Sequence, residues 1–557
     1  MKKKIISSAI LVTMLFQSVP AFASNKIDSA KSYDVSVSDS LKVPFYSTDD
    51  NFKGGLVPGF GSSVAFKGYD SDGNMQFYAI TDRGPNGDAP QYTENGNSSD
   101  AKLFPCPDFT PSIGIITIKG DSASVNSEIE LKDSTGKKIT GLPLAPGSIG
   151  ATGEAALDLD LNNIGYDSEG LDTEGIDVDK EGNFWICDEY GPFIIKADST
   201  GKILEKYGPG EGLPEILKYR IPNRGFEGIA VTPSGKIIAA VQSVLNVDGQ
   251  TSKTACFTRM VEFDPETKET KMFAYPVDLS QYKSPKDCKI GDIYAVNDNK
   301  LLVIEQGKLK DKTMSNVVYK VDLTGATDIS GMTYNGKALE YADSETELPN
   351  IKFMTKEKYI DLRAEGWTSE KAEGICVLPD KKTIAVTNDN DFGITTSISD
   401  SLNQDTDITD YVYNSETKRF TLNNVKAEPK ISVVPNNDPA QIWIFKADKA
   451  VDDKTEESES GYVKLRDAAM ALKGTQNEFS VGFDASVKSI FVKTGESYKN
   501  IGTEDKNVPV INTDNNTQAG WILYVNGTKS NIKSVNVNGN NCFKISDLES
   551  VLGCKLN

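Results

Sequence analysis

The sequence predicts an all-β protein: a β-propeller followed by a small α+β C-terminal domain. Three observations support this fold class. A hairpin-like segment recurs along the middle of the chain, 38% of the residues are hydrophobic and 9% aromatic, and the composition changes near residue 447. With 557 residues, the chain is long enough for more than one packed core.

The recurring segment is clearest in three copies that align without gaps. Each opens with Glu-Gly and an alternating apolar run, passes through a turn, and ends its second apolar run at a polar residue 15 positions after the glutamate. The copies run from Glu174 to Glu189, from Glu227 to Gln242, and from Glu373 to Asn388. This pattern is typical of a β-hairpin.

Two weaker copies extend the repeat. Residues 291–306 keep the spacing but lack the opening glutamate, and residues 62–83 contain a longer turn. The copies are mostly about 50 to 80 residues apart, which leaves room for four strands in each unit. Radial repetition of such sheets forms a propeller, and residues 35–446 offer space for six blades, or seven. A β-sandwich is the alternative architecture.

Hairpin geometry predicts where the polar residues meet. The start of the first strand lies beside the end of the second in an antiparallel pair. If the first strands line the central channel, the polar residues at these strand ends converge on one mouth of that channel. The residues expected there are Asp82, Arg83, Glu174, Asp188, Glu189, Glu227, Gln242, Glu305, Glu373, Asn388 and Asp389.

The chain contains no histidine. Ser-His-Asp and Cys-His catalysis and His-ligated zinc or copper sites are therefore excluded. Crowded carboxylates must be protonated, paired or bound to metal, and calcium prefers oxygen ligands of this kind. We predict calcium as the cofactor, and the expected ligands are Glu174, Glu227, Glu373 and Asp389.

Cations beside these carboxylates suit a small anionic substrate such as a phosphate ester. Arg83, Arg224 and Lys371 are the expected phosphate-binding residues, and Asp82 and Glu189 are expected to orient the attacking water. Such a site hydrolyses an ester without an imidazole. The structural alternative is that the Glu-Gly pairs only shape the hairpins and that the cations form salt bridges between blades.

The N-terminus predicts export. Residues 1–23 combine a Lys2-Lys3-Lys4 start, an apolar stretch and Ala21-Phe22-Ala23, as expected of a secretory signal peptide cleaved before Ser24. Its removal takes the formal charge from -20 to -23. This charge disfavours nucleic-acid binding, and no later stretch predicts a membrane span. We expect a secreted, extracellular protein.

Several motifs resemble one known family. They are Thr81-Asp82-Arg83-Gly84-Pro85-Asn86, Thr173-Glu174-Gly175-Ile176, Glu189-Tyr190-Gly191-Pro192, Pro222-Asn223-Arg224-Gly225-Phe226-Glu227-Gly228, Ile290-Gly291-Asp292, Lys371-Ala372-Glu373-Gly374 and Asn388-Asp389-Asn390-Asp391-Phe392-Gly393. Together they resemble the family called "esterase-like activity of phytase", over residues 45–445. The resemblance implies a secreted propeller whose acidic residues support phosphoester hydrolysis. The chain departs from the family pattern at Glu305-Gln306, where a Glu-Arg pair is usual, and this weakens the case for a phosphate contact there.

Two other functions compete with a calcium-dependent phosphoric ester hydrolase. The gluconolactonase-like propellers also place Glu, Asn and Asp around calcium, which would make this protein a lactonase or carboxylesterase. The second rival is a propeller that binds a ligand without catalysis.

Residues 447–460 are acidic and poor in apolar side chains, as expected of a linker. In residues 461–557, the segments starting at Tyr462 and Cys542 predict two similar amphipathic helices. This part resembles the stalk-type domain named after the N-terminal region of copper amine oxidases. It has no copper ligand set, so we expect a spacer or an adhesion module that contacts the cell wall.

Overall fold

The computed structural model describes residues 27–45, 52–403, 405–452, 462–500, 502, 504, 518–537 and 540–552. The chain divides into two compact units between Val451 and Asp452. The predicted signal peptide lies outside the described residues, as does most of the predicted linker. Among the described residues, no helix has both the length and the apolar character needed to cross a membrane.

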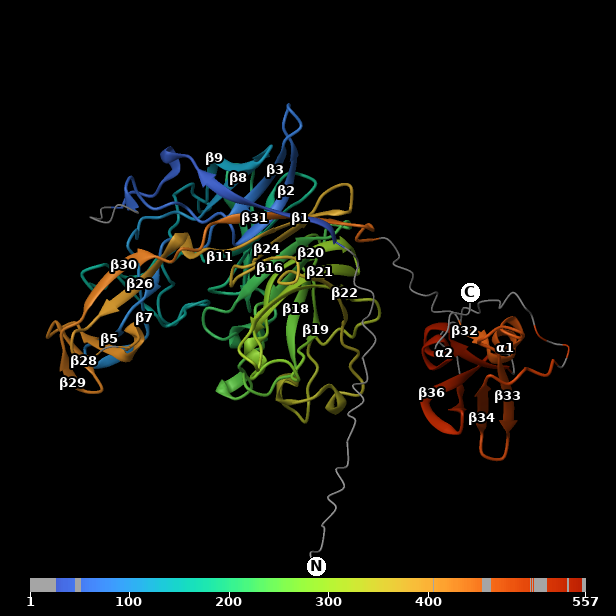
Figure 1. Cartoon of the computed structure of the whole chain (residues 1–557). Coiled ribbons are helices and arrows are strands. Elements are labelled where there is room, and N and C mark those ends of the chain that lie inside the picture. The colour runs from blue at the N-terminus through green and yellow to red at the C-terminus, as the bar shows by residue number, and fades with distance from the viewer. Residues whose placement is uncertain are drawn as a thin grey trace, which may run out of the picture. The chain divides into compact units, whose positions relative to one another are not determined.

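Four-stranded antiparallel sheets repeat along the first unit (Figure 1). The first sheet contains β2 (Ser63–Tyr69), β3 (Met75–Ile80), β8 (Ser112–Lys119) and β9 (Ser122–Glu130). The second contains β11 (Thr173–Val178), β12 (Phe184–Asp188), β13 (Phe193–Ala197) and β14 (Ile203–Pro209), with the short β15 (Gly212–Leu213) at its edge. The third contains β16 (Phe226–Val231), β17 (Ile237–Val241), β18 (Phe257–Phe263) and β19 (Thr270–Pro276).

The fourth sheet contains β20 (Lys289–Asn297), β21 (Lys300–Lys308), β22 (Met314–Asp322) and β23 (Thr355–Asp361). The fifth contains β24 (Gly374–Val377), β25 (Thr383–Thr387), β31 (Gln441–Ala447) and β1 (Ile27–Val37). The N-terminal strand β1 is thus the outer strand of the last sheet. It pairs antiparallel with β31 and also parallel with β9 of the first sheet, which closes the circle.

The described part of the chain forms a five-bladed propeller. The first strand of each sheet contacts the first strands of two other sheets, in the closed order β2, β11, β16, β20, β24 and back to β2. The prediction of an all-β propeller is confirmed, but the expected six blades were wrong. Chain length overestimated the blade count because long insertions, rather than a sixth sheet, occupy much of residues 81–111, 131–172 and 388–440.

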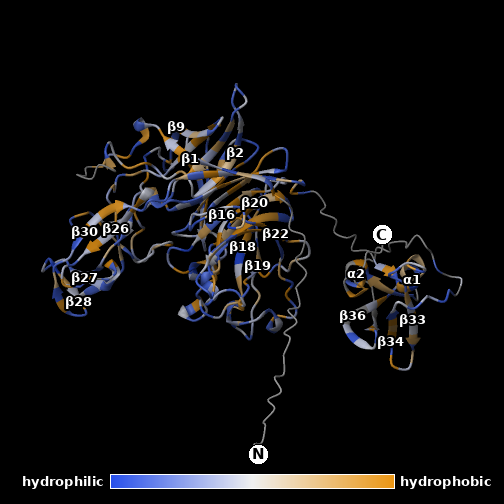
Figure 2. Ribbon diagram, in the orientation of Figure 1, coloured by the Kyte–Doolittle hydropathy of each residue, from blue (hydrophilic) through white to orange (hydrophobic). Residues whose placement is uncertain are grey.

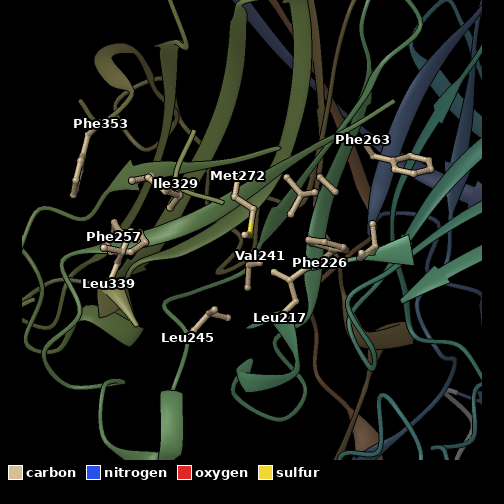
Figure 3. Packing of buried hydrophobic residues seen from close by; sticks show 14 of the residues in the cluster. Leu217, Phe226, Val241, Leu245, Phe257, Phe263, Met272, Ile329, Leu339 and Phe353 are labelled. Carbon is tan, nitrogen blue, oxygen red and sulfur yellow. The ribbon is translucent and has the colours of Figure 1, made fainter. Parts of the chain in front are cut away.

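Apolar layers between the sheets hold the blades together, and apolar residues concentrate on the strands (Figure 2). The largest cluster joins the second and third blades to the loop that follows β22, and it includes Phe226, Val241 and Leu339 (Figure 3). That loop is also anchored by an ion pair between Arg259 and Glu340, whose side chains are 2% and 0% exposed and whose two N–O distances are 2.6 and 3.0 Å.

The insertions of the first and fifth blades, with the connection between the first and second blades, build a lobe beside the propeller, seen with β5, β28 and β30 in Figure 1. It holds a three-stranded sheet of β4 (Gly87–Asp88), β7 (Ala101–Leu103) and β10 (Ala155–Leu157). A second sheet contains β5 (Gln91–Glu94), β6 (Asn97–Ser99), β27 (Tyr411–Asn414), β28 (Arg419–Leu422) and β29 (Val425–Ala427). The ribbon of β26 (Ile394–Ser399) and β30 (Lys430–Pro435) links this sheet to the fifth blade.

The second unit is the small α+β domain that the sequence predicted. Its helices are α1 (Leu465–Ala471) and α2 (Ile545–Leu552). Its sheet has the order β32 (Tyr462–Lys464), β37 (Asn540–Lys544), β36 (Thr528–Val537), β35 (Gln518–Val525), β34 (Ser489–Thr494) and β33 (Phe479–Asp484). Each helix directly follows one strand of the antiparallel pair β32–β37, and both helices pack on one apolar core that includes Leu465 and Leu548.

Candidate functional site

Strand register places five residues, each within an inner strand or directly before it, at the same level of the channel, and we call them the deep ring. In each blade, one residue of the inner strand pairs with the second strand at an equivalent position. These pairs are Val64↔Ala79, Ile176↔Ile186, Ile229↔Ala239, Ile293↔Val303 and Ile375↔Val386. Each deep-ring residue stands two positions before the first member of its pair. The deep ring is Ser62, Glu174, Glu227, Gly291 and Glu373. Its three glutamates each have a carboxylate oxygen within 4.8 Å of the others.

The glycine after each of these glutamates is required by close packing of the inner strands. A Cβ on Gly175 would lie 3.0 Å from the backbone nitrogen of Ile229, and one on Gly228 would lie 2.7 Å from that of Ile293. Side chains cannot fit at these distances. The Glu-Gly pair therefore has two functions: the glycine lets the inner strands approach, and the glutamate lines the mouth.

Below the deep ring, Ser63 and Asp292 occupy positions equivalent to these glycines, and we call this level the waist. The Ser63 hydroxyl donates to Asp292 Oδ2 at 2.8 Å, and the same oxygen accepts the backbone N–H of Ile375 at 2.9 Å. The Ser63 oxygen in turn accepts the N–H of Ile176 at 3.1 Å. These bonds tie four of the five inner strands together across the channel.

Above the deep ring, the residues that end the second strands form a rim. Register assigns Asp82, Glu189, Gln242, Gln306 and Asp389 to this rim. The two glutamines hold neighbouring glutamates: Gln242 Nε2 donates to Glu189 Oε1 at 2.7 Å, and Gln306 Nε2 donates to Glu373 Oε1 at 3.1 Å.

The expectation that Glu305 joins the mouth was wrong. Successive side chains of a strand point to opposite faces, so Gln306 takes the mouth position and Glu305 points away from it. Glu305 instead accepts hydrogen bonds from the hydroxyls of Tyr275 and Tyr282 and pairs with Lys356.

The deep-ring glutamates are buried, with exposed fractions of 7% for Glu174, 2% for Glu227 and 5% for Glu373. Burial, reinforced by neighbouring carboxylates, raises the pKa of Glu174 and Glu227 well above the usual range. Burial also raises the pKa of Glu373 to about 7. Glu227 Oε2 has no hydrogen-bond partner among the described residues. Such a group of buried carboxylates is stabilised by a bound cation.

The predicted metal ligands do not form one group. Asp389 lies apart from the three glutamates, in a cluster with Asp82 and Asp391 whose oxygens approach within 4.8 Å. Lys371 pairs with Asp389 and, at 2.9 Å, with Asp391. Burial lowers the pKa of Lys371, but these carboxylates and Glu373 outweigh that effect and raise it well above its usual range. An ammonium group thus already neutralises part of this second cluster.

The two catalytic candidates also lie at the rim. Burial, followed by the charges of Asp389 and Asp172, raises the pKa of Asp82 well above its usual range. Glu189 is held at both oxygens, because Gln242 donates to Oε1 and Asn223 Nδ2 donates to Oε2 at 2.8 Å. Burial, with a further contribution from Asp172, raises its pKa to about 8.

All three predicted phosphate-binding cations already have partners within the protein. The Arg83 side chain is 6% exposed, and its Nε lies 3.5 Å from Asp172 Oδ2. Arg224 donates to the backbone oxygen of Lys286 at 2.6 Å. Lys371 keeps 36% of its side chain exposed.

Sequence reasoning missed several mouth residues, and the repeat register could have found two of them, Asp172 and Lys289. Asp172, Lys289 and Lys371 each stand two positions before a deep-ring residue, so they share one level of the channel. Of these, only Lys371 was predicted. Asp172 forms a third carboxylate group with Glu174 and Glu189. Lys289 lowers the pKa of Glu189, Glu227 and Glu373, against the larger effect of burial.

Comparisons with known proteins found similar sequences and similar structures. A secreted protein of Arthroderma benhamiae, described as uncharacterized, is 28% identical over 284 residues, which are 42% of this chain and 54% of the relative. The match therefore spans about half the length of that relative.

Among solved structures, a protein of unknown function from Dyadobacter fermentans aligns over 76% of this chain and 100% of its own, with 10% identity and a TM-score of 0.30. Virginiamycin B lyase from Staphylococcus aureus aligns over 65% and 97%, with 11% identity and a TM-score of 0.25. At these TM-scores, neither structure bears on the chemistry of the mouth.

The family described as "Phytase-like: Esterase-like activity of phytase" matches residues 61–392. This segment is more than half of the chain and contains the complete deep ring and rim. It begins one residue before Ser62 and ends just beyond Asp391. The sequence therefore belongs to the phytase-like family.

Proposed function

We propose that this protein is a secreted, calcium-dependent hydrolase of phosphoric esters, with its active site at the propeller mouth. The observation that supports this most directly is the convergence of Glu174, Glu227 and Glu373, with Glu227 Oε2 lacking a partner among the described residues. A buried carboxylate oxygen without a hydrogen bond is costly unless a cation binds it.

The donor set favours calcium over other metals. Its oxygens come from carboxylates, and calcium accepts six to eight such oxygen ligands in flexible geometry. The chain has no histidine, and five of its seven cysteines are buried in the propeller, where burial raises the pKa of each thiol. Glu174, Glu227 and Glu373 would hold the ion.

A calcium ion at the deep ring would supply positive charge to the phosphoryl oxygens and to the charge that develops during hydrolysis. Glu189 is suited to take a proton from the attacking water, because Gln242 and Asn223 fix both of its oxygens and its pKa lies near neutrality. Asp82, whose pKa is raised well above its usual range by burial, is suited to protonate the leaving oxygen.

Lys371 is the side chain of this chain best placed to contact an anionic substrate. It carries its charge at the rim and remains one-third exposed. Arg83 and Arg224, which the sequence also assigned to phosphate, would instead hold Asp172 and the Lys286 backbone in place.

The pairing of these cations within the protein favours a second candidate, a calcium-dependent lactonase or carboxylesterase. With all three predicted cations paired inside the protein and many carboxylates at the mouth, an uncharged ester meets less repulsion than a polyphosphate. The same proton transfers by Glu189 and Asp82 would apply. A propeller that binds a ligand without catalysis is the third possibility.

Export is supported by the predicted signal peptide and by the description of the Arthroderma benhamiae relative as secreted. We extend the proposal to the C-terminal unit, which would act as a stalk-like spacer in contact with the cell wall.

The decisive experiment combines calcium titration with a substrate panel. The full chain would be assayed with phosphomonoesters, phosphodiesters, phytate and lactones, with and without a chelator. Phosphate release that needs calcium and is lost in Glu227→Gln, but not in the exposed control Glu266→Gln, would support the first proposal. Turnover of lactones alone would support the second. A folded, calcium-bound protein that turns over none of these esters would contradict both.

A further inference from the structure

Ser62 is the deep-ring residue of the first blade. It stands two positions before Val64, as Glu174 stands before Ile176 and Glu373 before Ile375. Its strand β2 lies in the ring between β11 and β24, the strands that carry Glu174 and follow Glu373. In the repeat, Ser62 stands where three other copies have a glutamate, so the first blade has a hydroxyl at that level.

The Ser62 hydroxyl is buried and unbonded. The residue has 0% exposure, and Oγ has no hydrogen-bond partner within the part of the chain that the structure describes. A buried hydroxyl normally has a partner, because losing its bonds to water without replacement is unfavourable. The neighbouring Ser63 follows this rule, since its hydroxyl both donates and accepts at the waist.

Two unbonded oxygens therefore belong to one level of the channel, Ser62 Oγ and Glu227 Oε2. Each is more than nine-tenths buried, and they come from different blades. A cation at this level would account for both, because it binds carboxylate and hydroxyl oxygens alike. A neutral hydroxyl also adds a ligand without adding a fourth negative charge to three crowded glutamates.

We propose that Ser62 Oγ is a direct ligand of the deep-ring cation, together with Glu174, Glu227 and Glu373. The site is then an asymmetric ring in which four blades supply a side-chain ligand and the fourth blade, with Gly291, supplies none. This inference rests on the cation site in the proposed function, but it concerns binding alone and is tested without turnover.

The test measures the ion directly in the full chain. Calcium affinity would be determined by calorimetry, and the number of water molecules on bound Eu³⁺ by luminescence decay in H₂O and D₂O. Ser62→Ala should weaken calcium binding by about tenfold, a loss typical of removing one group that supports a metal. It should also add one water molecule to bound Eu³⁺, because water takes the place of the hydroxyl.

Ser243→Ala is the matched control, since Ser243 is also buried and its Oγ is unbonded among the described residues, but it lies outside the deep ring. It should leave both readouts unchanged. Ser62→Gly, which copies the residue of the fourth blade, provides a second variant if the alanine protein does not fold.

Calcium binding that is lost in Glu227→Gln but unchanged in both Ser62 variants would overturn the assignment of Ser62 and leave the cation site standing. A wild-type chain that binds neither calcium nor Eu³⁺ would overturn the cation site itself.

Discussion

The deep ring and the waist are adjacent levels of one channel, yet they treat buried carboxylates in opposite ways. At the waist, Asp292 accepts hydrogen bonds from Ser63, Ile293 and Ile375, and both of its oxygens are used. In the deep ring, Glu227 leaves one oxygen unbonded among the described residues and lies close to two other glutamates. The side chains at both levels are buried.

This difference separates a structural use of charge from a functional one. A carboxylate that accepts several hydrogen bonds is stabilised by the protein itself. A carboxylate crowded by like charges and short of partners destabilises the fold unless something else binds it. Sites that sacrifice stability in this way are where function is expected.

The largest expected effect is at the waist. Asp292→Ala would remove the acceptor of Ser63 and of two backbone N–H groups, all of them buried. We expect the propeller to lose about 4 kcal/mol of unfolding free energy, the scale of breaking a buried network. Urea denaturation in the presence of a chelator would measure this.

The control for that experiment is Ser63→Ala, which removes one hydroxyl from the same network and should cost about 1 to 2 kcal/mol. If Asp292→Ala were no more destabilising than Ser63→Ala, Asp292 would not be the residue that joins the inner strands.

A substitution in the deep ring should have the opposite effect on the stability of the chelated protein. Glu227→Gln removes one charge from a crowded group, so the chelated variant should unfold at the same urea concentration as the wild type or at a higher one. With calcium at 100 times its Kd, the wild type should gain about 2.7 kcal/mol while the variant gains little. Their order of stability would then reverse.

Denaturation curves with chelator and with calcium test this reversal, and Glu266→Gln is the control that should track the wild type in both. A wild type that calcium does not stabilise, or a variant that is destabilised under both conditions, would place Glu227 with the waist as a structural residue.

Much of this contrast could be predicted from the sequence, because the repeat is gap-free around its glutamates. Convergence of Glu174, Glu227 and Glu373 required only hairpin geometry and a ring of inner strands. The blade count could not be read in the same way, since insertions lengthen the interval between repeats and β1 completes the last blade from the other end of the chain.

The wrong and missed residues at the strand ends, Glu305, Ser62 and Gln306, have one cause. Aligning the repeats by residue type selected the carboxylate of Glu305 and passed over Ser62 and Gln306. Strand alternation assigns faces by position and not by chemistry. Pairing partners that sequence cannot show, such as Asp172 for Arg83, decided which predicted cations remain available for a substrate.

The smallest expected effect concerns Asp177, which lies on the same strand as Glu174 and below the waist. Asp177 accepts backbone N–H groups from Val178 and Val231, both at 2.8 Å, but it remains partly buried. Burial raises its pKa from the ordinary 3.8 to about 6. The folded protein therefore binds this proton more tightly than the unfolded chain does, and stability falls as the pH rises from about 4 to about 6.

Asp177→Asn cannot ionise, so its stability relative to the wild type should increase over that pH interval by about 2 kcal/mol, partial exposure reducing the full effect. Urea denaturation at pH 4, 5, 6 and 7 in chelator would follow the difference, which should level off above pH 6. Any constant effect of losing one acceptor oxygen cancels in the comparison across pH. A difference that does not change with pH would mean that Asp177 is ionised throughout, and that its two backbone hydrogen bonds outweigh the effect of burial.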